Sequence, residues 1–207
     1  MNPAPDSGSW DQRYGASELV WTLEPNRWVV EVLAEVAPGR ALDLGAGEGR
    51  NAIWLAQRGW QVEAVDFSSV GLERARRLAD AAGVAQRLAT VVDDVVDYTP
   101  APGGFDLALL SYLQLPQVER LAAVRNAARG VAPGGLLVVV AHDLSNLAQG
   151  SGGPQDPAVL YTAEDVVADL GAIAEQWQVL RAEVVLRPVR GSDVPARDAL
   201  AVLRRTD

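Results

Sequence analysis

From Arg40 onward, the chain alternates short apolar runs with segments of helical periodicity. Five runs are apolar at nearly every position, as expected of strands buried on both faces of a parallel sheet. They cover residues 41–44, 62–66, 88–92, 105–110 and 136–141. Helices are predicted between them, over 50–59, 68–82 and 117–131. Strands and helices that alternate in this way are typical of βαβ units on a parallel sheet.

The pattern changes after the fifth strand. Residues 145–162 are rich in Gly, Pro, Ser and other polar residues, and we expect them to form a long loop on the substrate side. Thr162 and Asp165 predict a capping box that opens a short helix. The last two strands, 177–186 and 198–204, are joined by a segment too short for a helix, so they predict an antiparallel hairpin. The expected fold is therefore α/β: a Rossmann-like, doubly wound, seven-stranded sheet, mostly parallel with an antiparallel C-terminal hairpin.

Residues 1–39 are interpreted as an N-terminal extension to this sheet. One helix is predicted over 25–36, after an irregular aromatic segment that holds Trp10, Tyr14 and Trp21. These aromatic side chains either form a lid over a bound ligand or anchor the segment on the sheet. A chain of 207 residues with no visible repeat predicts a single domain over 1–207.

Composition narrows the possible partners. The net charge is −9, and all 18 basic residues are arginines that form no block, which argues against nucleic acid because duplex affinity depends on cationic phosphate contacts. The absence of cysteine excludes disulfides, thiolate zinc sites and a cysteine nucleophile. No apolar run approaches the roughly 18 residues of a membrane span, and the first residues do not resemble an export signal. We expect a cytoplasmic monomer or homodimer that acts on a small molecule and binds no membrane.

The stretch ALDLGAGEGRN (41–51) carries the candidate chemistry. Its glycines stand between a strand and a helix, where they can bring backbone N–H groups close to a nucleotide. From Gly47 the run also fits the permissive dinucleotide fingerprint, with Asp66 as the ribose acid, so an NAD(P)-dependent oxidoreductase is an alternative. Asp43 argues against it, because an acid inside this strand suits a cationic ligand better than a pyrophosphate. A chain without lysine also cannot hold a Tyr-x-x-x-Lys pair.

The sequence L-D-L-G-A-G-E-G (42–49), with an acid ending the second strand and another after the third, resembles class I S-adenosylmethionine-dependent methyltransferases. The run GEGRNAIWLAQRGWQVEAVDFS (47–68) is similar to the small tellurite-resistance and thiopurine-type members. The resemblance implies S-adenosylmethionine as cofactor, S-adenosylhomocysteine as product, and methyl transfer to O, N, S or a metalloid of a small-molecule acceptor. A non-catalytic S-adenosylmethionine-binding protein is a further alternative. No metal is expected, since one histidine and scattered acids make no recognised ligand spacing.

The resemblance also implies which residues meet the cofactor. Asp43 would lie near its amino group, and Asp66 would accept both ribose hydroxyls. Either Asp93 or Asp94 would meet the adenine amino group, and Asp94 is preferred because an apolar residue follows it. Arg50 would reach the cofactor carboxylate, unless it is only a solvated side chain. The full set is Asp43, Gly45, Ala46, Gly47, Arg50, Asp66, Phe67, Asp93, Asp94, Val95 and Ser111.

His142 and Tyr112 are the candidate catalytic residues. His142 is the only histidine; it follows the fifth strand, where ligands of open α/β sheets bind, and it titrates near neutrality. It acts on the acceptor, or it caps the strand and ties the long loop to the core. Tyr112 follows the fourth strand and would face the methyl group. Asp143 and Tyr14 are further candidates for a base, which is needed only if the acceptor loses a proton.

Overall fold

The computed structural model describes residues 7–16 and 22–206, and the chain divides into two compact units, 1–98 and 99–207. Its seven strands form a mixed sheet, mostly parallel with antiparallel C-terminal strands, which confirms the predicted fold class. The single domain stays a prediction, and Trp21 lies outside the described residues. Within the described ranges, no helix is both long enough and apolar enough to cross a membrane.

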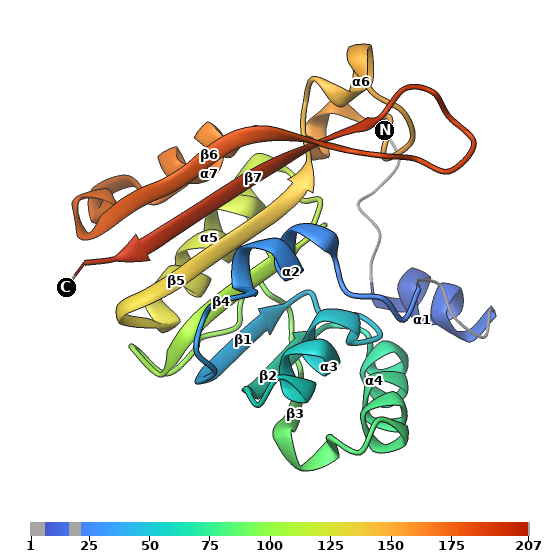
Figure 1. The fold of residues 1–207 in the computed structure, drawn as a ribbon, viewed down its shortest axis with the longest axis vertical. Helices are drawn as coiled ribbons and strands as arrows, with labels where there is room; N and C mark the ends of the chain where they lie inside the picture. Colours follow the sequence, from blue (N-terminus) through green and yellow to red (C-terminus); the bar gives the residue numbers. More distant parts are fainter. Residues whose placement is uncertain (1–6, 17–21, 207) are drawn as a thin grey trace. The chain divides into compact units, whose positions relative to one another are not determined.

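The first unit is built on three parallel strands, in the order β3-β2-β1 (Figure 1). They are β1 (Arg40–Leu44), β2 (Gln61–Asp66) and β3 (Leu88–Val92), and their carboxyl ends meet at one edge because Leu44 pairs with Val65 and Asp66 with Val92. Helices α3 (Arg50–Gln57) and α4 (Ser69–Ala81) pack on these strands, and a short 3-10 helix, η1 (Ala85–Arg87), precedes β3. This edge positions the glycine loop and the predicted acids.

The N-terminal helices differ from the prediction. The helix expected over 25–36 is shorter, α2 (Arg27–Leu33), and begins where the Asn26 side chain accepts hydrogen bonds from the N–H groups of Trp28 and Val29. The segment predicted to be irregular forms α1 (Ser7–Ala16), so that prediction was wrong. α1 has no acid in its first turn, and it contacts α4. The contact is tertiary, and a local sequence pattern does not show it.

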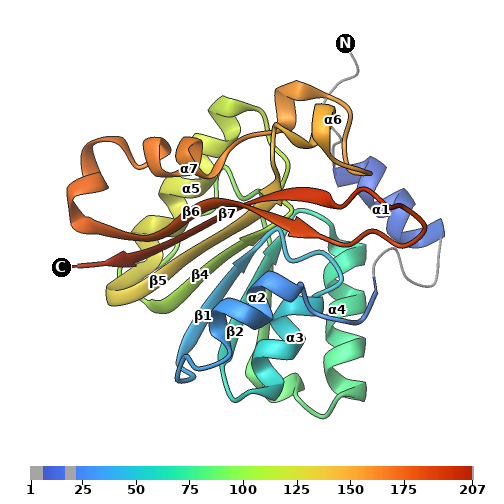
Figure 2. The same ribbon diagram turned by 45° about the horizontal axis from the view of Figure 1, so that its top comes forward.

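The second unit holds four strands in the order β4-β5-β7-β6. They are β4 (Phe105–Ser111), β5 (Val131–His142), β7 (Ala196–Arg205) and β6 (Trp177–Arg187). β5 is parallel to β4, whereas β7 is antiparallel to both β5 and β6, which confirms the C-terminal hairpin. Helices α5 (Gln117–Gly130) and α7 (Ala163–Asp169) contact each other on one face of these strands (Figure 2), and the 3-10 helix η3 (Gly171–Gln176) leads into β6.

The segment predicted as a long loop contains two helical turns, α6 (Asn146–Gln149) and the 3-10 helix η2 (Pro157–Val159). The Asn146 side chain donates to the Gly152 carbonyl and accepts from the N–H of Arg197, at 2.8 Å in both cases. The capping box after the loop is confirmed, because Thr162 and Asp165 exchange two hydrogen bonds between side chain and backbone. The position of the 145–162 loop on the substrate side stays a prediction.

A buried ion pair joins α5 to α7. Arg120 Nε lies 2.6 Å from Asp169 Oδ2, Arg120 Nη2 lies 3.3 Å from Oδ1, and both side chains are buried. The guanidinium also lies over the Tyr161 ring, 4.9 Å from its centroid. Removal of either partner would leave an uncompensated charge in the protein interior.

We expect Asp169→Ala to lower the free energy of unfolding by about 3–5 kcal/mol, because it leaves the buried Arg120 charge without its carboxylate partner. Urea unfolding of the two proteins measures the difference. The matched control is Glu183→Ala, which breaks the exposed ion pair between Arg181 and Glu183 and should change the free energy by less than about 1 kcal/mol. Similar losses in the two variants would contradict the assignment.

Candidate functional site

The glycine loop that joins β1 to α3 is fixed to the neighbouring strand β2. The N–H groups of Gly45 and Ala46 both donate to the Val65 carbonyl, at 2.9 and 3.0 Å. Gly45 and Gly47 have φ angles of 75° and 54°, in the left-handed region that disfavours side chains. The loop therefore turns sharply at the carboxyl end of β1, where the sequence predicts a cofactor.

At two positions of this loop a glycine is also required because a neighbouring side chain comes too close for a Cβ atom. A Cβ atom on Gly47 would lie 2.6 Å from the Tyr14 hydroxyl, and a Cβ atom on Gly49 would lie 2.8 Å from the Ala75 side chain. Gly49 thus lets α4 pack against the loop, while Gly47 leaves room for α1. All three glycines of the GxGxG pattern have positive φ angles, and the last two also allow helices to pack against the loop.

Asp43, the last residue but one of β1, is a buried acid, 1% exposed. The N–H of Ala52, in the first turn of α3, donates to the carboxylate, but Oδ2 is buried without a hydrogen-bond partner in the part of the chain that the structure describes. Burial raises the pKa of Asp43 to about 7; the negative charge of Asp66 acts in the same direction, and the positive charge of Arg50 opposes it. A cationic amino group that donated to Oδ2 would satisfy this oxygen and stabilise its ionised form.

Asp66 organises the loop through both oxygens of its carboxylate. The N–H of Gly47 donates to Oδ2 at 2.8 Å, and the N–H of Ser68 donates to Oδ1 at 2.9 Å. The side chain is 6% exposed; burial raises its pKa, and the two N–H donors oppose that change. Each oxygen has a second lone pair, so the same carboxylate can still accept two ribose hydroxyls.

Asp93 and Asp94 follow β3 at the same edge. The N–H of Asp93 donates to the Asp66 carbonyl at 3.2 Å, and Asp93 Oδ1 accepts from the N–H of Asp94 at 2.8 Å. Asp94 is exposed, and its negative charge contributes to the raised pKa of Asp66. The structure brings both acids close to Asp66, and the choice between them for adenine stays a prediction.

The other predicted cofactor residues take the positions that the strand ends dictate. Arg50 is the first residue of α3, near enough to influence Asp43, and Phe67 is partly buried directly after β2. Val95 is buried. Ser111 ends β4 in the second unit, and its hydroxyl is buried without a hydrogen-bond partner among the described residues. The ligand role of each stays a prediction.

The docking of α1 on the glycine loop was not predicted. Glu48 of the loop is buried and pairs with Arg74 of α4 at 2.6 Å, and a second guanidinium nitrogen of Arg74 donates to the Tyr14 carbonyl at 2.7 Å. Asp11 of α1 accepts hydrogen bonds from the Ser68 hydroxyl and from a backbone N–H in the first turn of α4. Glu48 offered a signal, since an acid between two glycines needs a partner when it is buried.

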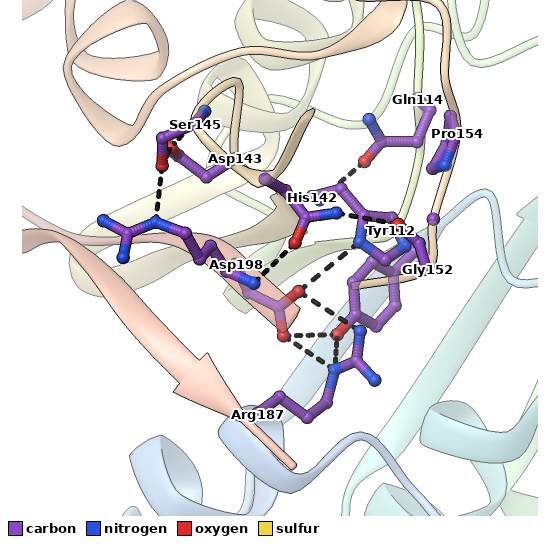
Figure 3. A network of polar contacts seen from close by, with 12 residues as sticks. Tyr112, Gln114, His142, Asp143, Ser145, Gly152, Pro154, Arg187 and Asp198 are labelled. Carbon is purple, nitrogen blue, oxygen red and sulfur yellow. Dashed lines mark hydrogen bonds and ion pairs between the residues drawn. The ribbon is translucent and has the colours of Figure 1, made fainter. Parts of the chain in front are cut away.

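A polar cluster in the second unit contains both candidate catalytic residues (Figure 3). Asp198, fully buried on β7, accepts from the Tyr112 hydroxyl at 2.7 Å and from Arg187 Nε at 2.8 Å. Its other oxygen lies 3.6 Å from His142 Nδ1. Arg187 Nε also lies 2.8 Å from the Tyr112 hydroxyl oxygen. Strand pairing creates the cluster, since His142 and Asp198 are directly opposite each other on β5 and β7.

His142 is held between a ring and a glycine. Its imidazole centroid lies 4.8 Å from that of Tyr112, and a Cβ atom on Gly153 would come within 2.8 Å of Nδ1. Its backbone N–H donates to Gln114 Oε1 at 2.9 Å. Burial lowers the pKa of His142, assisted by the positive charge of Arg187 and opposed by the negative charge of Asp198. The imidazole is therefore neutral at pH 7 and able to accept a proton.

Tyr112 has a left-handed backbone, with φ at 55°. Such a conformation is strained for a residue with an aromatic side chain and is often found at functional sites. Burial and the negative charge of Asp198 raise the pKa of the Tyr112 phenol, so this hydroxyl stays protonated at neutral pH and acts as a hydrogen-bond donor. Of the two candidates, only His142 can serve as a base near pH 7.

Asp198 and Arg187 were missed by the sequence analysis, which considered Asp143 beside His142 instead. Asp143 Oδ1 accepts from the N–H and hydroxyl of Ser145, at the start of α6, so this oxygen supports the loop. The signal for Asp198 was its place in the apolar stretch ARDALAVL (196–203). A charged residue in a strand whose neighbours are buried requires a partner, as Asp43 does.

Part of the chain is similar to known methyltransferases. Residues 41–135 match the family described as "Methyltransferase domain". The tRNA 5-carboxymethoxyuridine methyltransferase of Escherichia coli K12 is 32% identical over 121 residues, which are 56% of this chain and 46% of that protein. The chain thus spans about half the length of this curated relative.

Two solved structures have similar folds. The N-methyltransferase NodS from Bradyrhizobium japonicum, in complex with S-adenosylhomocysteine, has a TM-score of 0.74 at 18% identity, over 98% of this chain and 100% of that one. TehB from Haemophilus influenzae has a TM-score of 0.68 at 15% identity, over 97% and 67%. At such identities the likeness concerns the fold alone.

The fold and the site define an α/β protein with an acid-flanked glycine loop at the carboxyl end of its first strand. Residues 41–135 match a methyltransferase domain and the fold is shared with a solved methyltransferase, so this region is similar to class I S-adenosylmethionine-dependent methyltransferases, which supports the resemblance seen in the sequence. The closer resemblance to the tellurite-resistance and thiopurine types stays a prediction.

We expect Asp43→Asn to stabilise the cofactor-free protein as the pH rises. The folded state keeps a proton on Asp43 up to about pH 7, whereas the unfolded chain releases it near pH 4, so ionised Asp43 destabilises the fold by at most about 4 kcal/mol at pH 8. The difference in free energy of unfolding between variant and wild type, from urea melts, should therefore shift in favour of the variant between pH 4 and pH 8.

Asp106→Asn is the control for this comparison, because it removes one negative charge from an exposed position. If both variants followed the same trend with pH, the effect would reflect net charge rather than the burial of Asp43. A difference that does not change with pH in Asp43→Asn would contradict the raised pKa.

Proposed function

We propose that the chain transfers the methyl group of S-adenosylmethionine to a small-molecule acceptor. The observation that carries this proposal is the buried Oδ2 of Asp43, which has no hydrogen-bond partner among the described residues. A nucleotide with a pyrophosphate would bring negative charge to this carboxylate, whereas the amino group of S-adenosylmethionine would bring a matching cation. The NAD(P)-dependent alternative is disfavoured on the same ground.

The residues of the first unit would bind and orient this cofactor. Asp43 would hold its amino group, Asp66 its ribose hydroxyls, and Asp93 or Asp94 its adenine. When bound, the cofactor supplies the methyl group and a good leaving group, so the main task of the protein is to position the reactants. Because Asp66 also accepts from the Gly47 N–H, the residue that binds the ribose also fixes the loop.

The cluster of the second unit would serve an acceptor that must lose a proton. His142 is the general base, because its lowered pKa keeps the imidazole neutral at pH 7. Asp198, 3.6 Å from Nδ1, would stabilise the imidazolium that forms when the proton is taken, in the manner of a catalytic Asp-His pair. Arg187 and Tyr112 hold the Asp198 carboxylate in place through their hydrogen bonds.

A small molecule fits the charge of the chain better than RNA does. The Escherichia coli relative acts on tRNA, but this chain has 27 acidic and 18 basic residues, and RNA affinity rests largely on cationic contacts to phosphate. A cytoplasmic location, and a monomeric or homodimeric state, are part of the same proposal. They rest on the sequence composition alone.

Cofactor binding by isothermal titration calorimetry should rank S-adenosylmethionine and S-adenosylhomocysteine far above NAD. Binding of a cation beside Asp43 requires its ionised form, so we expect affinity to fall as the pH drops below about 7 and to level off above it. Asp43→Asn should weaken binding about tenfold or more and remove this pH dependence. Preferential NAD binding would contradict the proposal.

Methyl transfer should be assayed by release of S-adenosylhomocysteine against thiols, phenols, amines, metalloid oxyanions and a tRNA mixture, at saturating cofactor. For an acceptor with a removable proton, we expect His142→Gln to lower kcat by about 10²–10⁴-fold and to abolish the acidic limb of the pH profile below about pH 6.5. Glu183→Gln, an exposed substitution on β6 outside the His142 cluster, is the control. Unchanged turnover in His142→Gln would remove His142 from the mechanism, and turnover of tRNA alone would contradict a small-molecule acceptor.

A further inference from the structure

A pocket lies in the second unit, where β4 and β6 begin and β7 ends. Its volume is about 520 Å³, within the usual range for small-molecule sites. It is far from the His142 cluster, because His142 lies at the other end of β5. From Leu136 to His142 alone, β5 extends about 20 Å at roughly 3.3 Å per residue. The residues of the His142 cluster do not line this pocket.

The pocket is basic in a chain that is acidic overall. Arg125, Arg129 and Arg205 line it, and no acidic residue does. Two of these guanidinium groups are held by backbone carbonyls, since Arg125 Nε donates to the Asp169 carbonyl at 2.8 Å and Arg205 Nη1 to the Val131 carbonyl at 2.5 Å. Across residues 7–16 and 22–206, no ion pair joins any of the three arginines to a carboxylate. Their positive charge is therefore not neutralised by these residues.

Two of the residues that line the pocket carry buried donors without acceptors. Trp177, the first residue of β6, is 7% exposed, and its indole Nε1 has no hydrogen-bond partner among the described residues. Arg205 Nε is also buried without an acceptor in this part of the chain. A buried N–H without an acceptor is costly, so native proteins rarely keep one unless water or a ligand satisfies it.

Apart from Gln176, the rest of the lining is apolar. It includes Leu170, directly before η3, and Ile173, within η3. A bare inorganic anion would leave this surface in contact with water. A ligand with both an anionic group and an apolar body would match the arginines and indole N–H at one part and the aliphatic side chains at another.

We propose that this pocket is a binding site for a small organic anion, a carboxylate or phosphate ester with an apolar or aromatic body. The anionic group would accept hydrogen bonds from Trp177 Nε1 and Arg205, and the charge of Arg125 and Arg129 would favour it. This site is separate from the proposed methyl-transfer site and does not depend on it. The proposal rests on the geometry of the second unit alone.

The indole N–H of Trp177 gives a direct readout in nitrogen-15 NMR spectra of the full chain. The chain has six tryptophans, and the Trp177→Phe spectrum identifies the resonance. We expect benzoate or phenyl phosphate to shift this resonance saturably, and the neutral isostere benzamide to leave it unchanged. Arg205→Met should weaken the binding at least tenfold, and Arg125→Gln should weaken it by a smaller factor.

Arg181→Gln is the matched control, because it removes a partly exposed arginine of β6 that pairs with Glu183 and does not line the pocket. It should bind the anions as the wild type does. Thermal unfolding of each variant establishes that it is folded before titration. Three results would each overturn the proposal: no saturable shift with either anion, an equal shift with benzamide, or unchanged binding in Arg205→Met. Displacement of benzoate by a tRNA mixture at lower concentration would make nucleic-acid phosphate the ligand and would also overturn it.

Discussion

Two hydrogen bonds to the Asp66 carboxylate hold the glycine loop at the edge where the cofactor is proposed to bind. This carboxylate stands at the end of a buried strand and accepts one N–H from the glycine loop and one from the turn that opens α4. These two hydrogen bonds join three backbone segments at one edge of the parallel strands. A glycine loop has many accessible conformations when it is unconstrained, so an acid that fixes it also prepares it for a ligand. The same carboxylate serves both purposes because each oxygen has two lone pairs.

Asp43 and Asp198 are both buried acids, but their negative charges are compensated to different extents. Asp198 is surrounded by Arg187 of β6, His142 of β5 and the hydroxyl of Tyr112, which follows β4, so its charge is compensated within the protein. Asp43 has the N–H of Ala52 and the more distant charge of Arg50, and one of its oxygens lacks a hydrogen-bond partner among the described residues. Such incomplete compensation of the Asp43 charge lowers the stability of the cofactor-free protein, and a cationic ligand would restore it.

Much of the fold was predictable because its signals are local. The buried strands are nearly continuous apolar runs, and Thr162 with Asp165 marks a helix start through chemistry confined to four residues. The cofactor acids Asp43, Asp66 and Asp93 or Asp94 were implied by the family resemblance, and their ligand roles stay predictions. The helix α1 was not predicted, because its sequence has little helical signal and its partner, α4, is distant in the chain. The positions of Asp198 and Arg187 in the site were not predicted either, because only strand pairing brings them to His142.

The contact with Arg74 couples the detachment of α1 to the unfolding of this helix. Ten residues with two glycines are too few to form a stable helix alone in water, and the contact from Arg74 satisfies a carbonyl in the last turn of α1, where helices lack internal partners. Detachment of α1 from the glycine loop would therefore also melt it. Its departure would be a local unfolding reaction rather than a rigid-body swing, and the entropy gained by the released segment would favour the detached state.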